Sequence, residues 1–374
     1  MKTYLPILLA CLTLLAAATL EAQSHTSVPL RLAQTIPLPN VEGYLDHMSV
    51  DLKRQRLFIP AEHQKSIEVL DLRLGRVIHT IKGFGGYPRK TVYIPYSDQI
   101  WVDDGDGTCK AFDGDSYQLV KTVPLSGVDK GSKMIPDNGA YDPATHLFYV
   151  AVTEDALAYA SAKAVTKGSI GIVDSMTGKY MGAIPVNGTD PAGIAIEPLK
   201  PRMFVILGDT GQVAVLDREK RALLATWPIT GGPQPHTVTL DAVHHRLFVG
   251  SRIQPGHLFQ PGKMVVMDSD TGRVIQALDS VGGADEIIYD PASRRIYLAG
   301  TTGIVDVFQQ VDANHYELLG EVPTGALSKT ALLVPELKRF YVAVPKHVIL
   351  TPPIPQSQEA TIEESKILVF DVLP

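Results

Sequence analysis

One segment repeats seven times along the chain, and this repetition limits the possible folds more than any other feature. Its most constant part is a basic or polar residue followed by an aliphatic and an aromatic one, as in Arg56-Leu57-Phe58. The first strands of successive copies end 44 to 55 residues apart, a period typical of propeller blades built from four strands. The other copies begin at Gln99, His146, Arg202, Arg246, Arg295 and Arg339.

Each copy has the pattern of a four-stranded meander. Short alternating or β-branched stretches are separated by polar or glycine-containing turns. The third stretch ends in an aspartate, and the sixth copy has Gln309 at that place. An all-β sandwich would not produce seven copies in register, so we predict an all-β, seven-bladed β-propeller with four antiparallel strands per blade. The aspartates are Asp71, Asp113, Asp174, Asp217, Asp268 and Asp371.

The two ends of the repeat array predict a closed ring. The seventh copy stops after its third strand, Lys366–Val372, while one spare strand, Leu30–Ile36, precedes the first copy. We expect that strand to complete the last blade, which would leave no open sheet edge in the ring. The propeller is therefore expected to be a single domain over residues 30–374.

The repeat pattern resembles the YVTN-type, YncE-like family of secreted propellers, which are WD40-like in architecture. The resemblance rests on the Arg-Leu-Phe-Val strand, the Val-Leu-Asp strand ending, and turns such as Asp174–Lys179 and Asp268–Arg273. It implies an exported, seven-bladed protein of the periplasm or cell surface. It supplies no catalytic residue, because propellers carry many unrelated activities.

The first residues agree with export. Lys2, the apolar run Leu5–Leu20 and small residues up to Ala22 form the pattern of a signal peptide over residues 1–22. We expect cleavage near Ala22, with lipidation of Cys11 as the alternative. The mature protein is then periplasmic or extracellular.

Charge and composition narrow the choice of partners. The formal net charge of −6 disfavours nucleic acid and anionic membranes, because both attract basic surfaces. No segment after the signal peptide is long and apolar enough to cross a bilayer. Cys109 is the one cysteine left after signal removal, and its strand-like surroundings indicate a buried, inert thiol. We expect a monomer that binds a small molecule or a protein.

The starts of the first strands predict where a ligand would bind, because in a propeller they line one entrance of the central channel. In the first copy they are Asp46 and His47, and their equivalents differ from blade to blade. Polar groups that converge on a concavity are typical of a small-ligand pocket, and the alternative is a wet entrance with solvated charges. The predicted ligand-binding residues are Asp46, His47, Arg89, Lys90, Asp137, Asn138, His236, Asp285, Glu286 and Lys329.

A bound cation is the sharpest form of this hypothesis. Five of these residues offer oxygen ligands for Ca²⁺ or another divalent cation, and His47 with His236 would favour a transition metal. Calcium-dependent lactonases on six-bladed propellers use a similar acid–amide set, but their motifs are not in register here. No other cofactor is indicated. The candidate metal ligands are Asp46, Asp137, Asn138, Asp285 and Glu286. The acidic stretch Asp103–Thr108 is interpreted as a hairpin turn rather than a calcium loop.

Long insertions are predicted on the same face as the channel entrance, and variable loops on a rigid scaffold usually carry binding. No Gly-x-Ser-x-Gly, Cys-x-x-Cys-His or Walker motif is present. We therefore predict a non-catalytic ligand- or protein-binding module. One alternative is a metal-dependent, lactonase-like hydrolase that uses the channel acids, and another is a cell-envelope scaffold that binds through Lys346–Ser365. The insertions are Ser126–Pro136, Thr153–Gly168, Arg252–Lys263 and Lys346–Ser365.

Overall fold

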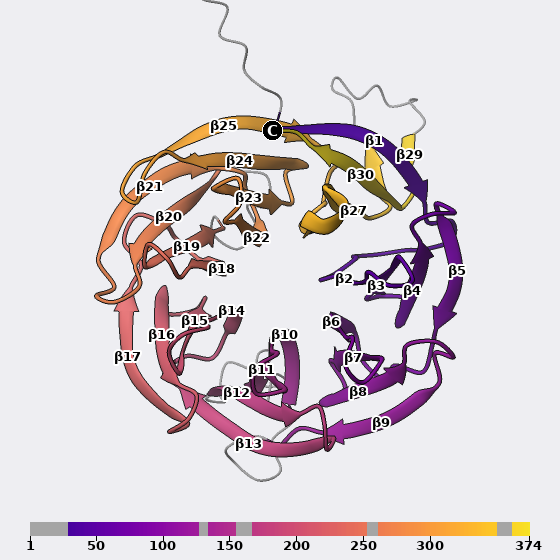
Figure 1. Cartoon of the computed structure of the whole chain (residues 1–374), viewed down its shortest axis with the longest axis horizontal. Coiled ribbons are helices and arrows are strands. Elements are labelled where there is room, and N and C mark those ends of the chain that lie inside the picture. The colour runs from indigo at the N-terminus through magenta and orange to yellow at the C-terminus, as the bar shows by residue number, and fades with distance from the viewer. Residues whose placement is uncertain (1–28, 127–133, 155–166, 253–260, 350–360) are drawn as a thin grey trace, which may run out of the picture.

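The computed structural model describes residues 29–126, 134–154, 167–252, 261–349 and 361–374. These residues form seven four-stranded sheets and one two-stranded hairpin. The seven sheets stand around a central axis like the blades of a propeller (Figure 1). The one helical element described is a 3₁₀ turn, Pro335–Leu337. The predicted all-β, seven-bladed propeller is confirmed.

The first strand of each blade lies nearest the axis, and the second strand lies directly outside it (Figure 1). Second strands are buried almost throughout, because they are covered by the neighbouring blades on both sides. The first strands are β2 (Ser49–Asp51), β6 (Pro88–Ile94), β10 (Met134–Asp142), β14 (Pro191–Ile196), β18 (Pro235–Asp241), β22 (Ala284–Asp290) and β26 (Thr330–Val334). The second strands are β3 (Arg56–Ala61), β7 (Gln99–Asp104), β11 (Leu147–Glu154), β15 (Arg202–Leu207), β19 (Arg246–Ser251), β23 (Arg295–Gly300) and β27 (Arg339–Val344).

The third strands are also buried, whereas the fourth strands form the half-exposed rim of the disc (Figure 1). The third strands are β4 (Ser66–Asp71), β8 (Thr108–Asp113), β12 (Lys167–Asp174), β16 (Gln212–Asp217), β20 (Gly262–Asp268), β24 (Ile304–Gln310) and β30 (Lys366–Val372). The fourth strands are β5 (Arg76–Ile81), β9 (Leu119–Pro124), β13 (Lys179–Val186), β17 (Ala222–Pro228), β21 (Val274–Ser280), β25 (Tyr316–Pro323) and β1 (Leu30–Pro37).

The N-terminal strand closes the ring as expected. In the seventh blade the strand order is β1-β30-β27-β26, and β1 pairs antiparallel with β30 from Leu30 opposite Val372 to Pro37 opposite Lys366. The first and last described parts of the chain are therefore joined in one sheet, which ties the two ends of the ring together by backbone hydrogen bonds.

The repeated aspartates cap the hairpin turns of the blades. Oδ1 of Asp51, at the end of a first strand, accepts backbone hydrogen bonds from Lys53 (2.9 Å) and Arg54 (3.1 Å). Asp71, at the end of a third strand, accepts the same pair of bonds from the turn that follows it. The same pattern recurs at Asp113, Asp174, Asp217, Asp241 and Asp268. The Val-Leu-Asp ending is thus a turn cap in blades 1 to 5, where the same turn follows the third strand.

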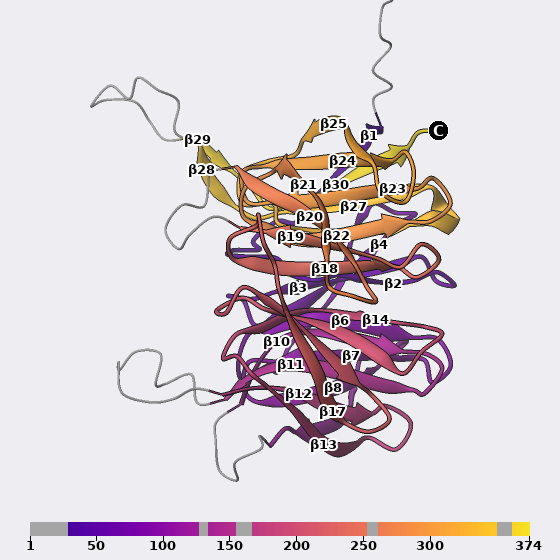
Figure 2. The same cartoon turned by 90° about the vertical axis from the view of Figure 1, so that its left-hand side faces the viewer.

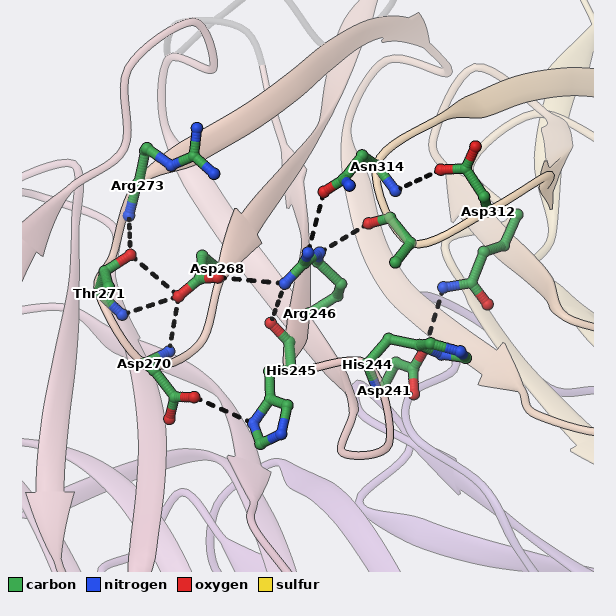
Figure 3. Close-up of polar contacts among 12 residues, drawn as sticks. Asp241, His244, His245, Arg246, Asp268, Asp270, Thr271, Arg273, Asp312 and Asn314 are labelled. Atoms are coloured by element: carbon green, nitrogen blue, oxygen red, sulfur yellow. Dashed lines mark hydrogen bonds and ion pairs between the residues drawn. The ribbon is translucent and has the colours of Figure 1, made fainter.

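These turns lie together on one face of the disc, the turn face, where arginines also link adjacent blades. Arg246 of blade 5 bonds Oδ2 of Asp268 in its own blade at 3.1 Å. Its other nitrogens donate to the backbone oxygen of Ala313 and to Oδ1 of Asn314, both in blade 6 (Figure 3). Figure 3 also shows Asp270 of the same turn facing His245. Charge-assisted bonds of this kind fix the angle between two blades.

The opposite face, the mouth face, carries the starts of the first strands and the ends of the second strands. Most of the predicted insertions lie outside the described residues. The exception is a hairpin, β28 (His347–Ile349) with β29 (Thr361–Glu363), inside a segment predicted as loop (Figure 2). Among the described residues, no helix has the length and apolarity needed to cross a membrane.

Two local predictions are confirmed by the packing of blade 2. Cys109 is fully buried, which raises the pKa of its thiol well above the ordinary value. The acidic stretch is a hairpin turn between β7 and β8, closed by a bond from Gly107 N–H to the Asp104 carbonyl at 3.0 Å. Its carboxylates at Asp104 and Asp106 bind Lys110 of the same blade.

Candidate functional site

Backbone bulges direct the predicted site residues at the channel. Five of the first strands lose their regular register with the second strand near the mouth face. In three of them the bulge leaves out a single residue, which is Asp137, His236 or Asp285. A bulge turns a side chain out of the normal alternation of a strand. In blades 2 and 4 the irregular positions are Arg89 with Lys90 and Ala192 with Gly193.

Blade 1 reaches the same place by a different route. Asp46 and His47 precede β2 rather than beginning it, and His47 bridges in parallel to Lys90 of blade 2. The His47 N–H donates to the Arg89 carbonyl at 3.1 Å, and the His47 carbonyl accepts from Thr91 N–H at 3.0 Å. Both Asp46 and His47 are therefore held by backbone bonds and are almost completely buried.

These side chains surround a cavity of about 420 Å³ at the mouth of the channel, here called the mouth cavity. Its wall is formed almost entirely by charged or polar residues, and all seven blades contribute to it. A volume of this size suits a small molecule. The lining residues are Asp46, His47, Arg89, Ile135, Asp137, Thr153, Asp190, His236, Arg252, Asp285 and Lys329.

Lys329 and Arg89 neutralise the acids on one side of the mouth cavity. Nζ of Lys329 lies 2.8 Å from Asp285, 3.7 Å from Glu62 and 3.8 Å from Asp46. Nη1 of Arg89 lies 3.2 Å from Glu62 and 3.5 Å from Asp46. Two cations thus sit among three buried carboxylates, the arrangement that makes charges tolerable away from water.

Asp285 collects further positive and polar partners. Nε2 of His236 lies 2.9 Å from Oδ1 of Asp285, and a terminal nitrogen of Arg252 contacts the same oxygen. Nε of Arg252 donates to the Ala284 carbonyl at 3.0 Å, so the guanidinium is held in place. The described ends of two insertions, at Thr153 and Arg252, lie in the wall of the mouth cavity.

The neighbouring Asp46 and Glu62 differ in their ionisation. Burial alone would raise the pKa of Asp46, but Lys329, His47 and Arg89 outweigh it and hold that pKa well below the usual range. Burial, together with the negative charge of Asp46, raises the pKa of Glu62 to about 7. Two carboxyls that share the same cations therefore do not both ionise at the same pH.

Three predicted site residues, Glu286, Asn138 and Lys90, are not part of the cavity lining, and the first two bond neighbouring groups through their side chains. Nδ1 of His47 is bonded to Glu286 at 2.7 Å, and Glu286 keeps a lowered pKa because Lys90 and His47 offset its burial. Oδ1 of Asn138 accepts the Gly139 N–H at 2.7 Å. The Lys90 N–H donates to Asp103 at 2.6 Å.

Three residues of the site are not among the predicted ligand-binding residues. Glu62 and Arg252 follow the second strands β3 and β19, and Asp190 precedes β14. Aligning the ends of the second strands as well as the starts of the first strands would have found Glu62 and Arg252, because both sets meet at the mouth face. Asp190 lies just before the first strand of blade 4, where the aligned positions are Ala192 and Gly193 and carry no polar side chain.

One group of described residues has the spacing of a metal site. Ligand atoms of Asp46, His47 and Asp285 lie within 4.8 Å of one another. The ammonium of Lys329, however, already contacts both carboxylates, and Arg252 contacts Asp285. A divalent cation placed there would meet these like charges at short range, where repulsion is strong. The trio fits an internal cation, the lysine, better than a metal.

The comparisons with known proteins identify the fold. Neither a family profile nor a curated protein matches the chain. A chain of Kuenenia stuttgartiensis hydrazine synthase has 15% identity and a TM-score of 0.65, covering 87% of this chain and 97% of that one. The WD40 repeats of RRP9 have 11% identity and a TM-score of 0.70, covering 92% and 99%. A chain of the mitotic checkpoint complex has 12% identity and a TM-score of 0.68, covering 100% and 99%.

The structural similarity establishes that the fold is a WD40-like seven-bladed propeller. Sequence identities this low say nothing about its ligand. The resemblance to the YVTN-type, YncE-like family stays a prediction, because no family profile supports it.

Proposed function

We propose that this propeller is a non-catalytic binding module that takes a small polar ligand in the mouth cavity. The observation that carries the proposal is the direction of the bulged residues. Asp137, His236 and Asp285 leave the regular strand register and line one cavity of about 420 Å³. Side chains that serve only to seal a channel would not need three separate bulges to converge on it.

The chemistry of the wall favours binding over catalysis. Each cation of the wall is committed to a carboxylate, and the hydroxyl of Thr153 donates to the Thr189 carbonyl at 3.0 Å. Cys109 is fully buried in blade 2 and is not part of the cavity lining. The described lining therefore offers no free hydroxyl or thiol nucleophile, and the carboxylates that a lactonase-like hydrolase would use for a metal face Lys329.

The N-terminal pattern supports a place for this function. We expect removal of residues 1–22 and release of the propeller into the periplasm or the extracellular space. These residues lie outside the described part of the chain. Mass spectrometry of the N-terminus tests this expectation on protein recovered from the cytoplasm and from the exported fraction. A full-length product found only in the cytoplasm would contradict it.

A thermal-shift screen tests the binding function. A panel of amino acids, amines, dicarboxylates and monosaccharides is added to the wild-type protein and to Ile135→Trp, which fills the cavity. The matched control is Leu199→Trp, at an exposed position on the turn face. A true ligand at about 100 times its dissociation constant stabilises the folded state by about 2.7 kcal/mol. This stabilisation should raise the melting temperature of the wild-type protein and of L199W. The rise should be absent in I135W.

The proposal is wrong if no compound of the panel stabilises the protein, or if the active compounds stabilise I135W equally. In the second case the ligand binds elsewhere on the surface.

A further inference from the structure

The cations of the mouth cavity are already satisfied by the protein itself. Lys329 lies against Asp285, Arg252 contacts the same residue, and Arg89 lies 3.2 Å from Glu62. An anionic ligand would have to separate these buried pairs, which is costly because it strands a carboxylate away from water. The groups of the wall that can bond a ligand are therefore hydrogen-bond acceptors for which no described residue is a donor.

Asp137 is the first free acceptor. Its nearest cation, Nη1 of Arg89, lies 3.7 Å from Oδ1, beyond hydrogen-bond distance, and no described residue donates to its side chain. Its carboxylate is 30% exposed and lines the mouth cavity. Burial opposes ionisation, but Arg89 and His236 keep the pKa of Asp137 below its ordinary value, so it is charged at neutral pH.

Asp190 is the second free acceptor, on the next blade. Its backbone N–H faces Asp209 at 3.4 Å and its carbonyl accepts from Gly208, but no described residue donates to its carboxylate. A Cβ atom on Gly208 would lie 2.6 Å from Oδ2 of Asp190. Because Gly208 has no side chain, the carboxylate of Asp190 fits beside it at the cavity.

His236 of blade 5 is the third. Nε2 lies 2.9 Å from Oδ1 of Asp285, and the ring hydrogen is assigned to it, because two acceptors would repel at that distance. Nδ1 is then an acceptor, and no described residue donates to it although His236 is only 9% exposed. Burial and Arg252 lower the pKa of His236 to about 3, against the opposing charges of Asp137 and Asp190, so the ring is neutral.

Resting on the proposed binding function, we propose that the ligand of the mouth cavity is a small protonated amine whose N–H groups bond Asp137, Asp190 and Nδ1 of His236. These acceptors come from three consecutive blades, and all three residues line the same cavity. An ammonium has three N–H donors, one for each acceptor, and a guanidinium has five. Bonds from a charged donor to a carboxylate are the strongest hydrogen bonds that such a wall can make.

The spacing of the three acceptors disfavours a metal ion. Within the described residues the trio is not among the groups whose ligand atoms all lie within 4.8 Å. Zinc bonds its ligands at about 2.1 Å, so two ligand atoms of one zinc ion lie less than 4.8 Å apart. An ammonium bonds its acceptors at about 2.8 Å and can lie between acceptors up to about 5.6 Å apart.

Isothermal titration calorimetry with three probes of equal length tests the inference. The probes are 1,4-diaminobutane, which is cationic, 1,4-butanediol, which is neutral, and succinate, which is anionic. Only the diamine is expected to bind saturably to the wild-type protein. Asp137→Asn and Asp190→Asn should each weaken it by at least about tenfold, the effect of losing one charge-assisted bond. Asp279→Asn is the matched control at an exposed acid and should bind as wild type.

Circular dichroism confirms folding of each variant, and Asp190→Ser replaces Asp190→Asn if the latter does not fold. Absence of diamine binding, equal binding of succinate, or unchanged diamine affinity in both asparagine variants would overturn the amine assignment. If another compound of the thermal-shift panel still binds in a way that Ile135→Trp abolishes, the binding module stands and only the amine is rejected.

Discussion

Nζ of Lys329 lies 2.8 Å from Oδ2 of Asp285, and this ion pair joins the first-strand start of blade 7 to that of blade 6. Both side chains are almost completely buried. The same ammonium reaches Asp46 and Glu62 of blade 1. One lysine thus holds together charges from three blades, and the shape of the mouth cavity depends on it.

Replacing Lys329 by methionine should destabilise the fold. The substitution keeps the length of the side chain but leaves three buried carboxylates with less positive charge, and breaking a buried pair costs about 3 kcal/mol or more. Urea denaturation measures the loss. Lys82→Met, at an exposed lysine, is the control and should change stability by less than about 0.5 kcal/mol. Equal stability of K329M and K82M would show that Lys329 is not needed.

The stability of the protein should fall as the pH rises from about 4.5 to 7. The pKa of Glu62 is raised from 4.5 to about 7 by burial and by Asp46, and burial raises that of Asp103 to about 7 as well. In this window the folded state holds protons that the unfolded chain has lost, so rising pH favours unfolding. Glu62→Gln should reduce the difference in unfolding free energy between pH 5 and pH 8 by about 1 to 3 kcal/mol.

The control for this pH dependence is Glu336→Gln, at an exposed glutamate of the 3₁₀ turn. It should keep the wild-type difference between the two pH values. An E62Q variant that keeps the wild-type difference between pH 5 and pH 8 would contradict the raised pKa of Glu62.

Calcium and zinc ions should leave the melting temperature unchanged. The Asp46, His47 and Asp285 trio has metal-like spacing, but Lys329 already supplies positive charge to both carboxylates. Differential scanning fluorimetry with each ion, compared with the same protein in chelator, checks this. A metal-dependent rise that disappears in Asp285→Asn would instead favour the hydrolase alternative.

Removing a turn cap should cost more where the aspartate also joins two blades. Asp241 accepts bonds from Val243, His244 and Gln310 of blade 6 and is buried, so Asp241→Ala should lose about 2 to 4 kcal/mol. Asp113→Ala removes a cap in an exposed turn and should lose about 0.5 to 2 kcal/mol. Chemical denaturation ranks the two variants. Equal losses would mean that the bond to Gln310 contributes nothing.

The repeat alignment anticipated part of the site. Asp46, Asp137, His236, Asp285 and Lys329 were placed at the channel entrance because first strands start there, and all five line the mouth cavity. The binding role of these residues is still a prediction. Asn138 and Glu286 were assigned the same role, but their side chains bond Gly139 and His47 inside the wall. Their neighbours Asp137 and Asp285 are the bulged residues, and a bulge reverses which of two adjacent side chains faces the channel.

The repeat in the amino-acid sequence predicts the number of blades, the four strands of each and the closing strand at Leu30. These features repeat because hairpin turns and alternating burial are local demands that every blade meets in the same way. Which charges meet is set by the folding of the chain into a ring. Glu62, Arg252 and Lys329 are far apart in sequence and gather around Asp46 and Asp285 through ring closure and strand bulges. Electrostatic pairing depends on distances of a few ångströms between blades, which a one-dimensional period does not record.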